Sequence, residues 1–505
     1  MHWRDAALPT LVLLPLIGSA VLLLAGRRAD RWAVWFGVVV QALGLFVALG
    51  ILAGFDTSRA QSMQYLVDVQ WVPQLDLSVR LGVDGVSLPL IVLTSLLGLL
   101  TAMYSLRHLP EPGQPRAFIG VLLLLQVGML GTFIALDLLL FFVFFEVVLI
   151  PMWFIIAFWG QGERRAAANT FILYTVLGSV VMLVGFLLVW VNTGTTDMVE
   201  LAAAHGSGLT SSIQFWAVLL IGLGLAVKTP MWPLHTWLPD AHTAAPTVGS
   251  VLLAGVLLKM GTYGMVRIAL PVLPSGAATV APYVAALAVV GILYGAFASF
   301  GQRDLKRLIA FSSVGHMGFV LLGLSTLDPI GVNAALFGNI AHGLITGLLF
   351  FLVGGIKERT KTTWFKDLPR GLYARAPRLG FLFGFACVAS LGLPGLAGFW
   401  GEFLALLGAY SPTLQDRLLY RTLLVFAAVG MVLTAAYFLR VLRRVGQGKP
   451  SPRPLRDVTE LEASCWTPLA VLVLVLGLFP GLLLNLTNPS VEQILSAPVV
   501  IGDGD

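Results

Sequence analysis

Apolar runs about twenty residues long recur along this chain of 505 residues, and they restrict it to one kind of fold. Each run is long enough to cross the hydrocarbon core of a bilayer as a helix. Only 11% of the residues are charged, against about 25% in a typical soluble domain. The sequence therefore predicts an all-α polytopic membrane protein with about fourteen transmembrane helices. The predicted spans are 8–26, 32–54, 86–106, 116–136, 138–160, 168–191, 213–246, 247–270, 281–301, 306–326, 330–353, 379–409, 420–443 and 466–487.

Basic residues are distributed unevenly between the turns that join these spans. Alternate turns, beginning with Arg27–Arg31, hold 23 of the 31 lysines and arginines, whereas the opposite turns hold six. Cytoplasmic turns carry an excess of Lys and Arg, so the basic turns are predicted to face the cytoplasm. Both termini are then expected on the non-cytoplasmic side of a bacterial-type plasma membrane or another energy-transducing membrane.

Two of the spans cannot be continuous helices. Pro230, Pro233 and Pro239 interrupt the hydrogen-bond ladder of the first, and Pro394 lies in a glycine-rich break in the second. Broken backbone at membrane depth is stable only where protein buries it or where it lines a wet cavity. Breaks at matching places in two halves are typical of transporter repeats.

The distance between the breaks suggests the organisation of the chain. We expect two inverted five-helix repeats, each with one broken helix, because a unit with an odd number of spans reverses the topology of the next. The predicted parts are an N-terminal three-helix segment (1–110), the first repeat (111–270), the second repeat (271–445), and a C-terminal span with its tail (446–505).

Four charged residues interrupt the apolar runs: Glu146, Lys228, Lys259 and Glu402. A lone charge at mid-bilayer costs about 2.5–3.5 kcal/mol on insertion scales. Such residues generally mark ion or proton pathways, which makes movement of protons or ions the first functional hypothesis.

Glu146 and Lys228 form the first candidate pair. Two unit charges 4 Å apart interact by about 4 kcal/mol at an effective dielectric constant near 20. A change in their separation would therefore alter how firmly Lys228 holds its proton. The alternative is a static buried ion pair that fixes helix packing. Lys228 adjoins the first helix break, and this position favours a role in proton transfer over a static ion pair.

Lys259, His316 and His342 are candidates for the next steps of a relay. Lys259 lies about twelve residues into its span, which argues against snorkelling to the surface. His316 and His342 each share a helix face with other polar residues, and histidine both accepts and releases protons near neutral pH. A hydrogen-bonded core histidine remains the alternative for either one. Metal ligation is not expected, because no cysteine or carboxylate has suitable spacing.

Glu402 follows the second break and is the candidate exit group. Three polar residues follow the first break: His235, Asp240 and His242. They would form either an entry for water at this break or only a polar loop end, and the sequence does not distinguish the two. Asp84 is interpreted as a cap for the helix that begins near residue 86.

Several stretches together resemble the antiporter-like subunits of respiratory complex I, NADH:quinone oxidoreductase, over nearly the whole chain. They are GVDGVSLPLIVLT, FFEVVLIPMWFII, VKTPMWPLHTWLPDAHTAAPTVGSVLLAGVLLKMGTYG, RDLKRLIAFSSVGHMG and PGLAGFWGEF. The similarity favours the M branch, counterpart of mitochondrial chain 4. Its second broken helix carries a glutamate, Glu402, where related branches usually carry lysine, and the chain ends soon after its last span.

The resemblance implies a function and a set of site residues. Glu146 and Lys228 would be the functional pair, Lys259 the central lysine, His316 and His342 its partners, and Glu402 the terminal group. NADH, FMN, iron-sulfur clusters and quinone would be bound by other subunits, with none in this chain. The implied partners are other membrane subunits of the complex, including related antiporter-like subunits on both sides, and membrane lipids, but no nucleic acid.

Three other functions stay open at this point. The shared motif also fits a subunit of a multicomponent sodium/proton antiporter or of a membrane-bound hydrogenase. A scaffold that only holds other pumping subunits in place is the third alternative.

Overall fold

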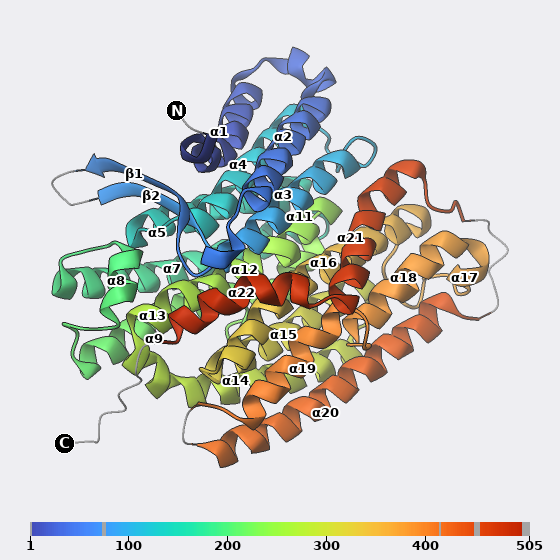
Figure 1. Ribbon diagram of the computed structural model, residues 1–505. Coiled ribbons are helices and arrows are strands. Elements are labelled where there is room, and N and C mark those ends of the chain that lie inside the picture. The colour runs from blue at the N-terminus through green and yellow to red at the C-terminus, as the bar shows by residue number, and fades with distance from the viewer. Residues whose placement is uncertain (1–2, 73–76, 414–415, 449–454, 497–505) are drawn as a thin grey trace.

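The computed structural model describes residues 3–72, 77–413, 416–448 and 455–496. Within these ranges, thirteen helices are long and apolar enough to cross a membrane, so the predicted helical membrane fold is confirmed. Figure 1 shows α1 and α2 at one edge of the bundle and α20 at the other, with α12, α15 and α16 between them. The uninterrupted membrane helices are α1 (Trp3–Leu24), α2 (Ala33–Ala53), α3 (Ser87–Tyr104), α4 (Pro115–Ile134), α7 (Arg164–Thr193), α14 (Pro274–Gly301), α15 (Leu305–Ser325), α16 (Pro329–Thr360), α20 (Arg417–Val441) and α21 (Glu460–Leu478).

Both predicted breaks are present. The first span divides into α9 (Ser211–Lys228) and α10 (Trp237–Ala244), and the second into α18 (Pro377–Ser390) and α19 (Ala397–Tyr410). The ring N–H of Trp237 donates to the carbonyl oxygen of Val227 at 3.0 Å, which satisfies a backbone group freed by the first break.

Two further spans are irregular in ways that the sequence did not predict. One is formed by α5 (Leu138–Val147) and α6 (Leu149–Trp159), which meet at Val148. The other contains two π-helical segments, and its parts are α11 (Thr247–Leu252), η4 (Leu253–Leu257), α12 (Leu258–Gly264), η5 (Met265–Ala269) and α13 (Leu270–Val272). π-Helical turns inside helices frequently occur at functional sites.

A β-hairpin lies between α2 and α3, where no strand was expected. Its strands β1 (Gln64–Val72) and β2 (Leu77–Val83) are antiparallel, and Leu136 N donates to Arg80 O at 2.9 Å to attach β2 to the bundle. Short helices complete the fold: α8 (Met198–Ala204) and α17 (Leu372–Arg375), with the 3₁₀ turns η1 (Arg27–Arg31) and η2 (Thr57–Arg59).

The predicted last span, 466–487, is misplaced. A capping box of Thr459 and Glu462 starts α21 earlier than expected, and the helix ends at Leu478, just before Pro480. A separate helix, α22 (Gly481–Ile494), then crosses the front of the bundle (Figure 1). Hydropathy merged the two because apolar residues continue through the turn.

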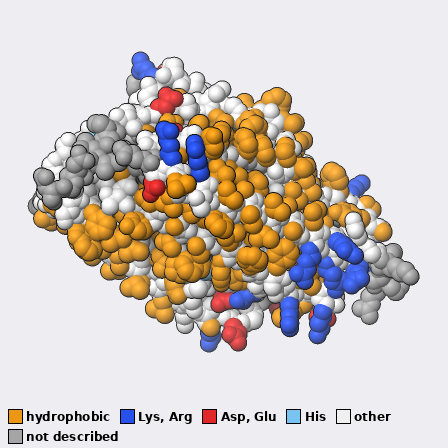
Figure 2. Space-filling view, turned by 90° about the horizontal axis from the view of Figure 1, so that it is seen from below, with side chains coloured by type: hydrophobic (Ala, Val, Ile, Leu, Met, Phe, Trp, Pro, Cys, Tyr) orange, Lys and Arg blue, Asp and Glu red, His pale blue; other side chains and the backbone are white. Residues whose placement is uncertain are grey.

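The basic turns meet at one end of the bundle, as the charge pattern predicted; we call it the basic end. Figure 2 shows apolar side chains over the middle of one face, with Lys and Arg towards its margins. Hydrogen bonds joining these turns run from Arg116 N to Asp30 Oδ1 (3.1 Å), from Lys357 Nζ to Gln161 Oε1, from Phe365 N to Arg303 O (2.9 Å) and from Arg359 Nε to Arg456 O (2.6 Å).

Asp84 lies towards the opposite end and does more than cap a helix. Its Oδ1 accepts hydrogen bonds from the backbone N–H groups of Val86 (3.1 Å) and Ser87 (3.0 Å), as predicted. The same oxygen lies 2.5 Å from Nη2 of Arg267, and both side chains are almost fully buried. The sequence did not predict this ion pair, because its two partners are 183 residues apart.

Asp84→Ala is expected to lower the free energy of unfolding by about 3–5 kcal/mol, because it leaves the Arg267 guanidinium buried without a counter-charge. Thermal unfolding of the purified protein measures the effect. Asp68→Ala is the matched control. It removes an exposed carboxylate whose pair with Arg80 should contribute less than about 1 kcal/mol. Equal unfolding midpoints for the two variants would show that the buried pair stabilises the fold no more than the exposed one.

Candidate functional site

Lys259 lies at the centre of the bundle with no exposed surface. Its Nζ donates to the carbonyl oxygen of Ala254, in the π-helical segment η4, and lies 2.7 Å from Nδ1 of His342 on α16. The lysine therefore contacts one histidine and one carbonyl, and neither of these contacts is with an acid.

His316 links the next two helices. Its Nδ1 lies 2.8 Å from Oε1 of Glu402 on α19, and its Nε2 lies 3.0 Å from Oγ of Ser390, the last residue of α18. The rings of His316 and His342 face each other edge to face, with centroids 5.6 Å apart. We call the four aligned residues the central row: Lys259, His342, His316 and Glu402.

A small cavity of about 30 Å³ completes the central row. Its lining includes both histidines, Ser390 and Glu402. His342 Nε2 and Glu402 Oε2 are buried and have no protein hydrogen-bond partner. A cavity needs roughly 10–15 Å³ and at least two polar partners to hold a water molecule. This one satisfies both requirements, so one water can bridge His342 to Glu402.

Lys228 and Glu146 are neighbours but not a closed ion pair. Lys228 is the last residue of α9 and is buried, and its Nζ lies 4.3 Å from the centroid of the Phe145 ring. Glu146 on α5 is half-buried, and the two charges interact electrostatically. In the described part of the chain they are not within 4.0 Å of each other. A static ion pair therefore does not describe this geometry.

The segments that carry Lys228 and Lys259 pack closely against each other. A Cβ atom on Gly261 would lie 2.3 Å from Oγ1 of Thr229, the residue that follows Lys228, so α12 packs directly on the end of α9. Only glycine permits this contact. The segments α9 and α12, which carry the two lysines, are thus in direct contact.

Two further buried groups extend the site towards the basic end. Lys306, at the start of α15, donates to the carbonyl oxygen of Ala245 beside the turn between α10 and α11. The His242 ring is fully buried against Phe350, with centroids 4.6 Å apart, and interacts electrostatically with both Lys306 and Lys259.

The sequence places Lys306 at the edge of a basic turn and leaves the role of His242 open. Lys306 lies between Arg303 and Arg307 in RDLKR, and only its burial distinguishes it from them. Arg307 instead forms a partly exposed ion pair with Asp240 at 2.7 Å. His235 packs against the ring of Tyr294. Of the three polar residues after the break, His242 is the one with an electrostatic interaction with Lys259 in the described structure.

Comparisons with known proteins agree with this architecture. Residues 135–434 match the family described as NADH:quinone oxidoreductase/Mrp antiporter, TM, and residues 12–132 match NADH-ubiquinone oxidoreductase chain 4, amino terminus. NADH-quinone oxidoreductase subunit M of Rhodobacter capsulatus is 41% identical, over 97% of this chain and 96% of that protein. NAD(P)H-quinone oxidoreductase chain 4 1 of Synechococcus sp. (strain JA-2-3B'a(2-13)) is 40% identical, over 94% of this chain and 90% of that protein.

Solved structures show the same fold. A chain of respiratory complex I from Thermus thermophilus with bound NADH superposes with a TM-score of 0.86 at 32% identity, covering 98% of this chain and 100% of that one. A chain of the Mrp complex from Dietzia sp. DQ12-45-1b gives 0.85 at 21% identity, covering 99% and 100%, and shares the fold. With its family matches and a relative 41% identical over almost its full length, the chain belongs to the family of NADH-quinone oxidoreductase subunit M.

Proposed function

We propose that this chain is a proton-translocating membrane subunit of an NADH:quinone oxidoreductase. The observation that carries the proposal is the central row. Four titratable side chains from four different helices adjoin one another in the core. Hydrogen bonds join Lys259 to His342 and His316 to Glu402, and the cavity beside them has room for a water between His342 and Glu402. Buried ionisable groups of this kind mark proton relays in membrane proteins.

The proposed mechanism starts with the open Glu146–Lys228 pair. When Glu146 approaches, Lys228 holds its proton; when the glutamate withdraws, the proton passes through water to Lys259. Moving one charge against about 150 mV costs roughly 3.5 kcal/mol. An interaction of about 4 kcal/mol at ion-pair distance is therefore large enough to drive the step.

The rest of the path follows the buried groups. Protons would enter from the basic end, where Lys306 and His242 lead towards Lys259, and would leave the central row at Glu402. The basic end is proposed to face the cytoplasm, with both termini on the opposite side of a bacterial-type plasma membrane or another energy-transducing membrane.

Electron transfer is proposed to occur in other subunits and to act on this chain through its neighbours. A neighbouring membrane subunit would change the separation of Glu146 and Lys228. This chain would hold no redox centre, and NADH, FMN, iron-sulfur clusters and quinone would belong to the rest of the complex. The expected neighbours include related antiporter-like subunits on both sides.

A sodium/proton antiporter subunit is the second candidate function, because the matching family model also covers Mrp antiporters. The two functions differ in what drives transport. Proton movement in proteoliposomes that starts on addition of NADH and quinone supports the oxidoreductase. Sodium-dependent proton movement without either compound would decide for the antiporter.

Lys306→Met is expected to slow NADH-driven proton uptake into proteoliposomes by at least about tenfold, since a positioned proton-transfer group commonly contributes a hundredfold or more. Arg307→Met is the control. It removes the neighbouring cation, which pairs with Asp240 at the partly exposed surface, and should leave uptake near the wild-type rate. If both variants pump equally well, protons do not enter past Lys306.

A further inference from the structure

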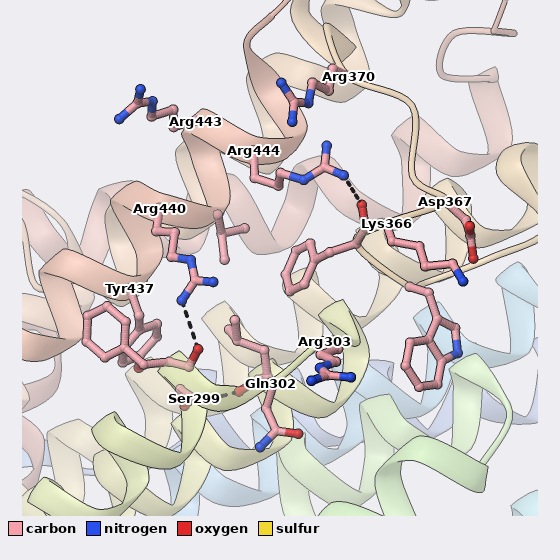
Figure 3. A pocket seen from close by; sticks show the side chains of 15 residues that line it. Ser299, Gln302, Arg303, Lys366, Asp367, Arg370, Tyr437, Arg440, Arg443 and Arg444 are labelled. Carbon is pink, nitrogen blue, oxygen red and sulfur yellow. Dashed lines mark hydrogen bonds between the residues drawn. The ribbon is translucent and has the colours of Figure 1, made fainter.

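A large cavity opens at the basic end, away from the central row. Its volume is about 900 Å³, and its walls come from the ends of α14 and α20, the π-helical segment η6 (Leu442–Gly446) and the turn after α16. Figure 3 shows charged side chains from three separate segments around it. The cations are Arg303, Lys366, Arg370, Arg440, Arg443 and Arg444, and the only carboxylate in the described lining is Asp367.

These cations are not neutralised by the protein. None of the six forms an ion pair within 4.0 Å in the part of the chain that the structure describes. Arg440 Nη1 donates to the carbonyl oxygen of Phe300 at 2.8 Å, and Arg444 Nη2 donates to that of Phe365. Carbonyl groups position the guanidinium ions but leave their charge uncompensated, and Arg370 and Arg444 repel each other. The cavity therefore holds a strong excess of positive charge.

The walls that continue from the cavity are apolar. Phe297 on α14, one turn from Phe300, is 62% exposed, and Leu439 on α20, beside Arg440, is 56% exposed. Trp364 lies at the cavity itself and is 53% exposed, a position typical of tryptophan where hydrocarbon meets headgroups. The cavity thus joins a cationic chamber to two exposed apolar helix faces.

We propose that this cavity binds the phosphate-bearing headgroup of an anionic phospholipid, whose acyl chains lie along the exposed faces of α14 and α20. Basic pockets between membrane helices on the cytoplasmic side suit such headgroups. Arginine is well fitted to them because its planar fork donates two hydrogen bonds to one phosphate. A free phosphate would use the cations but not the apolar walls. The lipid site is separate from the proton path and does not depend on the proposed pumping function.

Photolabelling of the purified complex tests this proposal. The probe is phosphatidylglycerol with a photoactivatable headgroup, incorporated in phosphatidylcholine nanodiscs, and mass spectrometry maps the labelled peptides. The test variant combines Lys366→Gln, Arg370→Gln and Arg443→Gln, which donate no hydrogen bond within the described structure. The control combines Arg27→Gln, Arg28→Gln and Arg31→Gln, which removes as many exposed charges from another turn of the basic end.

Labelling is expected at 299–308, 364–370 and 437–444, and it should fall by about tenfold or more in the test variant, because each cation near an anionic surface contributes roughly fivefold to binding. The control variant should keep wild-type labelling, and the same probe built on phosphatidylcholine should label the cavity weakly. Equal labelling of wild-type and test proteins would overturn the proposal. So would its suppression by soluble inorganic phosphate alone, which would indicate a free-phosphate site, or cross-linking of these peptides to another protein chain.

Discussion

Lys259→Met is expected to abolish proton translocation through this subunit, with a loss of at least about a hundredfold in its rate. Lys259 is the residue of the central row with no exposed surface, and it contacts the row through a single histidine. Methionine has a similar length and fills the buried space, but it cannot carry a proton. The measurement is the number of protons moved per NADH oxidised by the complex in proteoliposomes.

Assembly must be separated from proton transfer in this variant. The change leaves Nδ1 of His342 and the carbonyl oxygen of Ala254 without their lysine, at a cost of about 1–3 kcal/mol for each group. Lys361→Met, at the exposed end of α16, is the matched control for loss of a lysine. An intact Lys259→Met complex with the wild-type proton ratio would exclude the central row as the path, whereas a complex that fails to assemble would favour a scaffolding role.

Glu402→Gln has the second-largest expected effect. Glutamine preserves the shape of the side chain and its contact with His316, but it cannot accept and release a proton, so translocation should fall by about a hundredfold. The space is tight, since a Cβ on Gly392 would lie 3.1 Å from Oε2 of Glu402, and an isosteric change is therefore the cleanest. Initial rates of NADH-driven acidification in proteoliposomes report the loss.

Glu402→Lys is the informative companion, because the resemblance implies a lysine at the corresponding position in related branches. A lysine restores a titratable group, so this variant should translocate protons faster than Glu402→Gln. Wild-type rates in Glu402→Gln would mean that protons leave the row before reaching α19.

Much of the membrane architecture could be predicted because lipid imposes simple rules. A charge such as Lys259 stands out in an apolar run, and clustered prolines near Pro230 or a proline among glycines at Pro394 indicate a helix break. The basic turns meet at one end because an excess of Lys and Arg keeps a turn on the cytoplasmic side of the membrane. The inverted symmetry of the two proposed repeats and the division of the chain into parts stay predictions.

The order of the site residues could not be predicted from the sequence. Lys259 and His342 are 83 residues apart, and no local sequence pattern indicates that they are in contact. Charges and histidines inside apolar runs indicated the six candidate residues, and the resemblance to a family implied the same set. Only the packing of four helices places four of them in a row. The open geometry of Lys228 and Glu146 depends on how α9 ends against its neighbours, which residue types do not reveal.

Other features were missed because their signals are tertiary. The burial of Lys306 depends on a carbonyl acceptor 61 residues away. The β-hairpin is too short for a hydropathy window, and α22 was absorbed into the preceding span. The pairing of Arg267 with Asp84 joins residues 183 positions apart, which no local pattern reveals.

The most direct test is a comparison of proton translocation by Lys259→Met, Glu402→Gln and the protein carrying both changes. Groups that act in series on one path are strongly non-additive, so the double variant should move as many protons per NADH as either single variant. A double variant that loses the sum of the two single losses would mean that Lys259 and Glu402 serve separate routes, and the central row would not be a single path.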